Sequence, residues 1–245
     1  MRKLRKMPLY LAGIAMICIV ALVWSITAGQ MTVRTHYQAK TNVQTPKPYR
    51  VMVIGGSVAH GWDDKVGGGY LRRAFDHYPT YQYIDKTIVG ANSTQLQETL
   101  YKGDYETWLK EYRPNVVVIS WGLLNDCLPD TPKANFDKYL RVEITQALAS
   151  HAMVYVVSPP VTIASYTKYL VRQQRYVNDE LHVVRQIKSP NLYFFNVFDQ
   201  MKAYLRNHHL SVYDFGTNTW HPDAEGHIIA ARLLLADMQG SHSIK

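Results

Sequence analysis

The sequence predicts an α/β protein with a five-stranded parallel sheet between two layers of helices. Five short apolar runs, rich in β-branched and aromatic residues, recur between residues 51 and 197. A longer segment with apolar residues spaced three and four apart separates each run from the next, and one more follows the last run. Strands that alternate with helices in this way form a parallel sheet that helices cover on both faces. A three-layer α/β/α sandwich is therefore expected.

Each predicted element has its own pattern. The predicted strands are the apolar runs at 51–54, 81–89, 115–120, 153–158 and 192–197. The predicted helices are the segments at 67–78, 93–112, 134–151, 166–188 and 222–238. Ligands of parallel sheets bind beyond the carboxyl ends of the strands, so the residues directly after each run are the first candidates for a functional site.

The N-terminal region is predicted to lie outside this domain. Residues 9–28 form an uncharged stretch of the length that crosses a bilayer as a helix, and the basic residues of 1–8 precede it. We expect a single transmembrane signal-anchor with a cytoplasmic N-terminus, a polar linker at 29–49, and a domain at 50–240 on the extracytoplasmic side of the cell membrane. A cleaved signal peptide is the alternative, although its apolar core is usually shorter.

The net charge of +8 comes from the N-terminal region. Eight of the 27 Lys and Arg residues lie within residues 1–50, which contain no Asp or Glu. The other 19 basic residues match the 19 acidic residues of 51–245 in number. A formally neutral domain lacks the positive surface that non-specific binding to phosphates requires, so no nucleic-acid partner is expected.

Three polar residues occupy positions that suit a catalytic site at the sheet edge. Ser57 follows the glycine pair 55–56 at the end of the first apolar run, where a tight turn exposes its hydroxyl. Asn125 follows the third run, and His221 directly precedes the last predicted helix. Taken alone, each residue is more typical of a turn or a helix cap than of a catalytic site.

Together, these residues resemble the sequence blocks of the SGNH/GDSL hydrolases, a family of serine esterases and lipases with a flavodoxin-like fold. The segment GGSVAHG resembles the nucleophile block around Ser57, TIVGANS contributes Gly90, and GLLN contributes Asn125. His221 stands at the position of the family's base. The resemblance implies a carboxylic ester hydrolase with Ser57 as nucleophile, an oxyanion hole formed by the Ser57 and Gly90 N–H groups and the Asn125 amide, and no cofactor or metal.

Two positions depart from the family pattern. Gly56 replaces the Asp before the serine, and Asn218 replaces the Asp three residues before the histidine. An Asn can orient the imidazole but adds no charge, and this replacement in a Ser-His-Asp triad costs about 10⁴ in rate. We expect a Ser57–His221 dyad that Asn218 assists, with a backbone carbonyl or Asp214 as alternative orienting groups. On this reading, Asn218→Asp would raise the rate or leave it unchanged.

The expected substrate is an O-acyl ester on a cell-envelope glycan or lipid, which the enzyme cleaves or from which it transfers the acyl group. The family resemblance and the expected position outside the membrane both favour such a substrate. A different function, suggested by the missing acid, is that of a catalytically weak or inactive domain that binds envelope glycan. Asp63 and Asp64 are expected to be surface or helix-start acids, and no residues have the spacing of a metal site.

Overall fold

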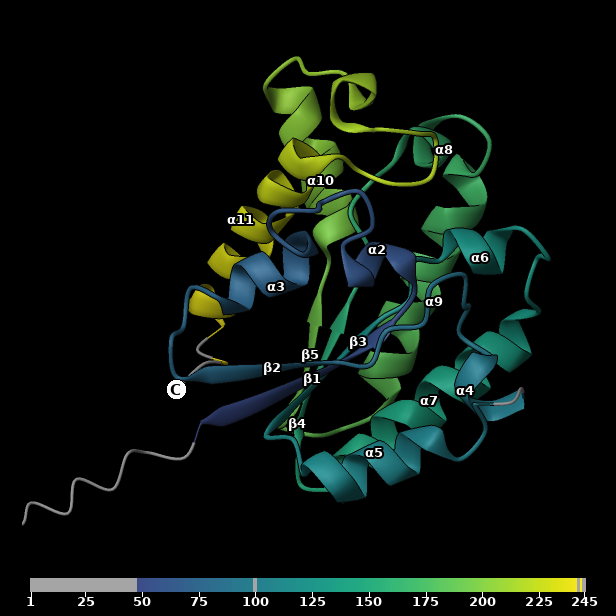
Figure 1. Ribbon diagram of the computed structural model, residues 1–245. Helices are drawn as coiled ribbons and strands as arrows, with labels where there is room; N and C mark the ends of the chain where they lie inside the picture. The colour runs from purple at the N-terminus through teal and green to yellow at the C-terminus, as the bar shows by residue number, and fades with distance from the viewer. Residues whose placement is uncertain (1–47, 99–100, 242, 244–245) are drawn as a thin grey trace, which may run out of the picture. The chain divides into compact units, whose positions relative to one another are not determined.

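The computed structural model describes residues 48–98, 101–241 and 243, and within them five parallel strands form one sheet (Figure 1). The strand order is β2-β1-β3-β4-β5. This is the flavodoxin-like order, in which the chain builds the sheet outward from β1 in both directions. The strands are β1 Tyr49–Gly55, β2 Tyr81–Asp85, β3 Val116–Ser120, β4 Met153–Val157 and β5 Leu192–Phe195.

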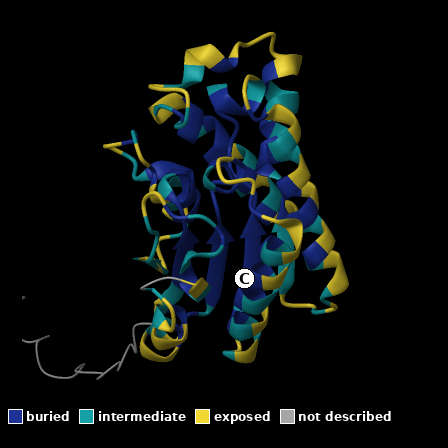
Figure 2. Cartoon of the chain, turned by 90° about the vertical axis from the view of Figure 1, so that its right-hand side faces the viewer, coloured by how far each residue is buried: buried dark blue, intermediate teal, exposed yellow. Residues whose placement is uncertain are grey.

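Helices cover both faces of the sheet, which confirms the predicted three-layer architecture (Figure 1). One face carries α3 Gly69–Phe75 and α11 Ala224–Gly240, and the other carries α5 Asp104–Tyr112, α7 Lys133–Ala149 and α9 Leu170–Gln186. The helix α10 Val197–Asn207 continues beyond the carboxyl end of β5 and packs against α11. The central strands β1, β3 and β4 are buried almost throughout, as Figure 2 shows. A strand that is buried on both faces needs apolar residues at consecutive positions, which explains the unbroken apolar runs.

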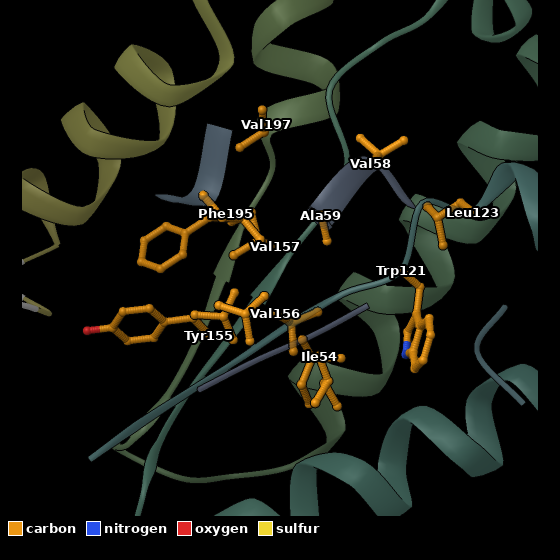
Figure 3. Packing of buried hydrophobic residues seen from close by; sticks show 14 of the residues in the cluster. Ile54, Val58, Ala59, Trp121, Leu123, Tyr155, Val156, Val157, Phe195 and Val197 are labelled. Atoms are coloured by element: carbon orange, nitrogen blue, oxygen red, sulfur yellow. The ribbon is translucent and has the colours of Figure 1, made fainter. Parts of the chain in front are cut away.

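Short helices gather beyond the carboxyl ends of the strands. They are α2 Ser57–His60, α6 Leu124–Cys127 and α8 Ile163–Tyr166, and the 3-10 helix η1 Val212–Phe215 lies near α8 (Figure 1). The hydrophobic core extends up to them, because Val58 of α2 and the neighbouring Leu123 are buried (Figure 3). This packing gives the loops at the sheet edge a rigid base.

Three predicted elements differ from the structure. The strand predicted at 81–89 ends at Asp85, although the N–H groups of Lys86 and Ile88 still donate to carbonyl oxygens of β1 at 2.8 Å. The helix predicted at 93–112 is two helices, α4 Gln95–Glu98 and α5, and Gly103 precedes α5 with a left-handed φ of 89°. The apolar run at 192–197 ends as a strand at Phe195, because the Asn196 side chain caps α10, a helix that the sequence analysis missed.

The predicted N-terminal segments 1–8 and 9–28, and nearly all of the predicted linker 29–49, lie outside the described residues. Within the part of the chain that the structure describes, no helix is long and apolar enough to cross a membrane.

A buried carboxylate fixes the loop between α2 and α3. The Asp64 side chain accepts hydrogen bonds from the N–H groups of Gly67 at 3.0 Å and Gly69 at 3.1 Å, and from Arg73 Nε at 2.6 Å and Nη2 at 2.9 Å. Burial acts to raise the pKa of Asp64, but Arg73 and the two backbone groups outweigh it and lower the pKa to about 2. The loop is thus tied to the first turns of α3 by a charged, fully buried side chain.

We expect Asp64→Asn to lower the free energy of unfolding by about 3 kcal/mol at pH 7, because it leaves Arg73 without its carboxylate. The native pKa of Asp64 lies below the unfolded value of 3.8, so its stabilising effect is complete above that pH and is lost as the pH falls toward about 2. Urea unfolding at pH 7, 5 and 3 measures this, with Asp76→Asn, an exposed residue at the end of α3, as the control. If the difference in the free energy of unfolding between wild type and Asp64→Asn stays constant down to pH 3, the lowered pKa of Asp64 is contradicted.

Candidate active site

Ser57 is the first residue of α2 and lies directly beyond the carboxyl end of β1. The chain turns at Gly55, where a side chain cannot fit because its Cβ would lie 2.0 Å from the carbonyl oxygen of Ser120 on the neighbouring strand β3. Gly56 then precedes the helix in an extended conformation. The two glycines therefore allow β1 to end against β3 and place the serine at the edge of the sheet.

His221 faces Ser57 although 164 residues separate them in the sequence. Its Nε2 lies 2.9 Å from Ser57 Oγ. The histidine lies just before α11, and Asp223 caps that helix by accepting a hydrogen bond from the Gly226 N–H at 2.8 Å. Burial lowers the pKa of His221 below its ordinary value of 6.5, and the negative charge of Asp63 partly offsets this effect. The imidazole is therefore mostly neutral at pH 7 and can accept a proton from the serine.

Asn218 holds the other side of the imidazole. Its Oδ1 lies 3.2 Å from His221 Nδ1 and also accepts hydrogen bonds from the N–H groups of Trp220 at 2.7 Å and His221 at 3.0 Å. An amide oxygen can only accept, so His221 Nδ1 must carry the hydrogen of this contact. The Nε2 lone pair is then free to face Ser57. The predicted trio of Ser57, His221 and Asn218 thus forms one hydrogen-bonded row.

The amide nitrogen of Asn218 contacts an acid that sequence analysis missed. Asn218 Nδ2 donates to Asp63 Oδ2 over 2.7 Å, and Thr217 Oγ1 donates to the same oxygen. The contact joins residues 155 positions apart, so no local spacing in the sequence reveals it. Asp214, the alternative acid, is exposed, and in the described part of the chain its carboxylate makes no hydrogen bond to His221.

The predicted oxyanion donors lie beside the Ser57 turn. Asn125 Nδ2 lies 3.9 Å from the position that a Cβ on Gly56 would take, and it donates to the Ala91 carbonyl oxygen at 2.9 Å. This bond uses one of its two amide hydrogens and leaves the other for a ligand. Gly90, next to Ala91, has a left-handed φ of 81°, which glycine adopts without strain.

A second buried carboxylate, that of Asp126, links α6, which carries Asn125, to the loop that carries Gly90. Asp126, the neighbour of Asn125, accepts hydrogen bonds from Ser93 N at 3.2 Å and Ser93 Oγ at 2.7 Å. Burial raises the pKa of Asp126 to about 6, although the hydrogen bonds from Ser93 act to lower it. At pH 7 the carboxylate is therefore mostly ionised and accepts both bonds, which holds the Gly90 loop against α6.

An exposed aromatic residue, Trp62, forms the outer wall of the site. Its ring centroid lies 6.2 Å from that of His221, and 45% of the residue is exposed to solvent. Trp62 also lines a hollow together with His60, Gly61, Asp63, Asp64, Lys65 and Gly68. Within the described residues, no group of three or more His, Cys, Asp or Glu residues is placed to hold a metal ion.

A family sequence model matches most of the domain. Residues 53–229 match the sequence model of the GDSL-like lipase/acylhydrolase family. The match begins in β1 and ends in α11, so it includes the segments of Ser57, Gly90, Asn125 and His221. A search of curated proteins finds no match.

Solved structures share the fold at low sequence identity. Protein YXIM from Bacillus subtilis superposes with a TM-score of 0.63 at 20% identity over 80% of this chain, which spans 58% of that protein. An acetyl-xylooligosaccharide esterase from Geobacillus gives a TM-score of 0.59 at 16% identity, covering 78% of this chain and 94% of that one. A family two carbohydrate esterase from Clostridium thermocellum gives a TM-score of 0.55 at 17% identity, covering 80% of this chain and 65% of that one.

We expect the reactivity of Ser57 to depend on the neutral form of His221. The rate at which a fluorophosphonate labels Ser57 should fall with decreasing pH, with a midpoint below 6.5, because burial lowers the pKa of His221. Labelling rates of the full-length protein between pH 4.5 and 8 measure this midpoint. A midpoint at 7 or above would contradict the burial of the imidazole as the dominant effect.

Proposed function

The chain belongs to the GDSL-like lipase/acylhydrolase family, and we propose that it is a serine ester hydrolase with Ser57 as nucleophile and His221 as general base. The observation that carries the proposal is the 2.9 Å contact between Ser57 Oγ and His221 Nε2. A serine hydroxyl becomes an effective nucleophile only when a base can take its proton, and this distance lies within hydrogen-bond reach.

The reaction proceeds in two steps through an acyl-enzyme. His221 Nε2 takes the Ser57 proton as Oγ attacks the ester carbonyl carbon, and the resulting imidazolium then gives this proton to the departing alcohol. In the second step, water attacks the acyl group, His221 takes the proton of the water, and Ser57 is released with its proton restored. Asn218 keeps Nε2 directed at the reacting atoms in both steps through its contact with Nδ1.

Three donors receive the negative charge that develops on the carbonyl oxygen. They are the N–H groups of Ser57 and Gly90 and the free amide hydrogen of Asn125. Within the described residues, no hydrogen bond uses the N–H of Ser57 or Gly90, so both are available to a ligand. Because their positions are set by glycine turns and by the Asp126–Ser93 link, these donors need little reorganisation when the charge appears.

The substrate that fits this surface best is a short O-acyl ester, such as an acetyl group, on a glycan. Trp62 offers an exposed ring beside His221 on which a sugar ring can stack. Two structural neighbours support the same class: one is named an acetyl-xylooligosaccharide esterase and the other a carbohydrate esterase. Acyl transfer to a second sugar would use the same acyl-enzyme.

We further propose that the protein acts on the cell envelope from the extracytoplasmic side of the membrane. The support for this location is the uncharged stretch 9–28, the basic residues before it, and the polar segment that connects it to the domain. An anchored enzyme would meet glycans of the envelope without having to bind them tightly.

We expect the full-length protein to hydrolyse 4-nitrophenyl acetate and to react with a fluorophosphonate at one serine. Ser57→Ala should abolish labelling and lower kcat/KM by at least about 10³-fold, because the nucleophile is lost. Ser189→Ala is the matched control, since Ser189 lies just before β5 at the opposite end of the strands, and it should leave both readouts unchanged.

Folded wild-type protein that is neither labelled nor active would exclude the hydrolase. Binding of an acetylated glycan by such a sample, measured by calorimetry, would favour the alternative of a catalytically inactive glycan-binding domain.

We expect Trp62→Ala to raise KM for an acetylated oligosaccharide about 3- to 10-fold, because it removes the aromatic surface beside the imidazole. KM for 4-nitrophenyl acetate, which has no sugar to stack, should change less. The backbone of the loop stays anchored in the variant, because the Trp62 carbonyl oxygen accepts its hydrogen bond from His227 at 3.3 Å. Equal changes for both substrates would argue against sugar binding at this surface.

A further inference from the structure

The hydrogen-bonded row that begins at Ser57 does not end at Asn218 but at the carboxylate of Asp63. Ser57 Oγ, the imidazole of His221, the amide of Asn218 and Asp63 Oδ2 follow one another at distances of 2.9, 3.2 and 2.7 Å. We propose that Asp63 is a positioning residue of the catalytic site, which fixes the Asn218 amide and supplies the negative charge that the position of Asn218 itself lacks. The proposal rests on the hydrolase function proposed above.

Asp63 holds the nitrogen side of the Asn218 amide, and backbone N–H groups hold its oxygen side. In the observed orientation, Oδ1 accepts from three N–H groups and Nδ2 donates to the carboxylate of Asp63. The flipped amide would place its oxygen 2.7 Å from a carboxylate oxygen and its NH₂ group against three donors. Asp63 and the two backbone N–H groups together exclude the flipped form, and His221 keeps its hydrogen on Nδ1 and its lone pair on Nε2.

Asp63 is also the charged group that stabilises the protonated imidazole. Two titratable groups on neighbouring elements face His221: Asp63 on the loop after α2, and His227 on α11. His227 is neutral at pH 7, because burial lowers its pKa, while its Nδ1 accepts from the Tyr70 N–H at 3.2 Å and its Nε2 donates to the Trp62 carbonyl. The negative charge of Asp63 is therefore not cancelled by a cation on α11.

The loop holds Asp63 in a conformation that needs support. Asp63 has a left-handed φ of 71°, which costs a non-glycine residue free energy. Its two neighbours in the chain, Trp62 and Asp64, are each anchored in the interior, one through His227 and the other through Arg73. A residue that is strained and held on both sides next to a proposed active site is typical of a functional position.

Four variants of the full-length protein separate charge from orientation. Asp63→Asn keeps an oxygen that can accept from Asn218 but removes the charge, whereas Asp63→Ala removes both. Asn218→Asp places a second carboxylate against Asp63, so the pair must share a proton or separate. The double variant Asp63→Asn/Asn218→Asp returns a single negative charge to the pair, now next to His221. Asp214→Asn is the matched control, an exposed Asp of the same region.

We expect Asp63→Asn to lower kcat/KM for 4-nitrophenyl acetate about 10-fold and to move the acid limb of the pH profile to lower pH, because the imidazolium loses its countercharge. Asp63→Ala should lower kcat more than Asp63→Asn does. The double variant should have a higher kcat/KM at pH 7 than either single variant, Asp63→Asn or Asn218→Asp. Its acid limb should move back to higher pH. Asp214→Asn should match wild type in both readouts.

The proposal is overturned if Asp63→Asn leaves both the rate and the acid limb unchanged, or if the double variant shows only the product of the two single effects. The pKa of the His221 imidazole, read by NMR, tests Asp63 without any substrate. A wild type that hydrolyses no ester would remove the proposed function, whereas an imidazole pKa that does not fall in Asp63→Asn would overturn only the role of Asp63 as the countercharge of His221.

Discussion

The buried carboxylate of Asp64 is the contact on which the outer half of the active site depends. It ties the loop after α2 to α3 through Arg73 and two backbone N–H groups. The same loop carries Trp62 to the imidazole of His221 and Asp63 to Asn218. The half-exposed carboxylate of Asp63 can hold the exposed amide of Asn218 only if the Asp63 backbone is fixed. The buried Asp64–Arg73 ion pair fixes this backbone and so determines the geometry of the contact.

The inner half of the site depends on a different constraint, the parallel order of the strands. Because β1 and β3 are neighbours and run in the same direction, the residues that follow them reach the same edge of the sheet. This is why the sequence was sufficient to predict that Ser57 and Asn125 lie together. The strands themselves were predictable for a related reason: strands buried on both faces show as unbroken apolar runs.

The parts that sequence reasoning missed are those that depend on contacts between distant loops. The pairing of Asp63 with Asn218 joins two irregular segments, and neither apolar periodicity nor a local motif encodes it. Asp63 therefore looked like an ordinary surface acid. The helix α10 was missed for a local reason: the apolar run of β5 continues into the first turn of the helix, and only the cap at Asn196 marks where one ends and the other begins.

Asp63 also changes the meaning of the asparagine at position 218. From the sequence, Asn218 replaces the acid of the triad, and Asn218→Asp is expected to raise the rate or leave it unchanged. In the structure, the amide stands between an imidazole that donates and a carboxylate that accepts, so it needs an oxygen on one side and an N–H on the other. A carboxylate at this position could serve His221 but would repel Asp63. In the family pattern, one aspartate both orients the histidine and supplies the negative charge. On the proposed role of Asp63, these two tasks are divided here: Asn218 orients His221, and Asp63 supplies the charge. An amide suits position 218 because the carboxylate of Asp63 lies behind it.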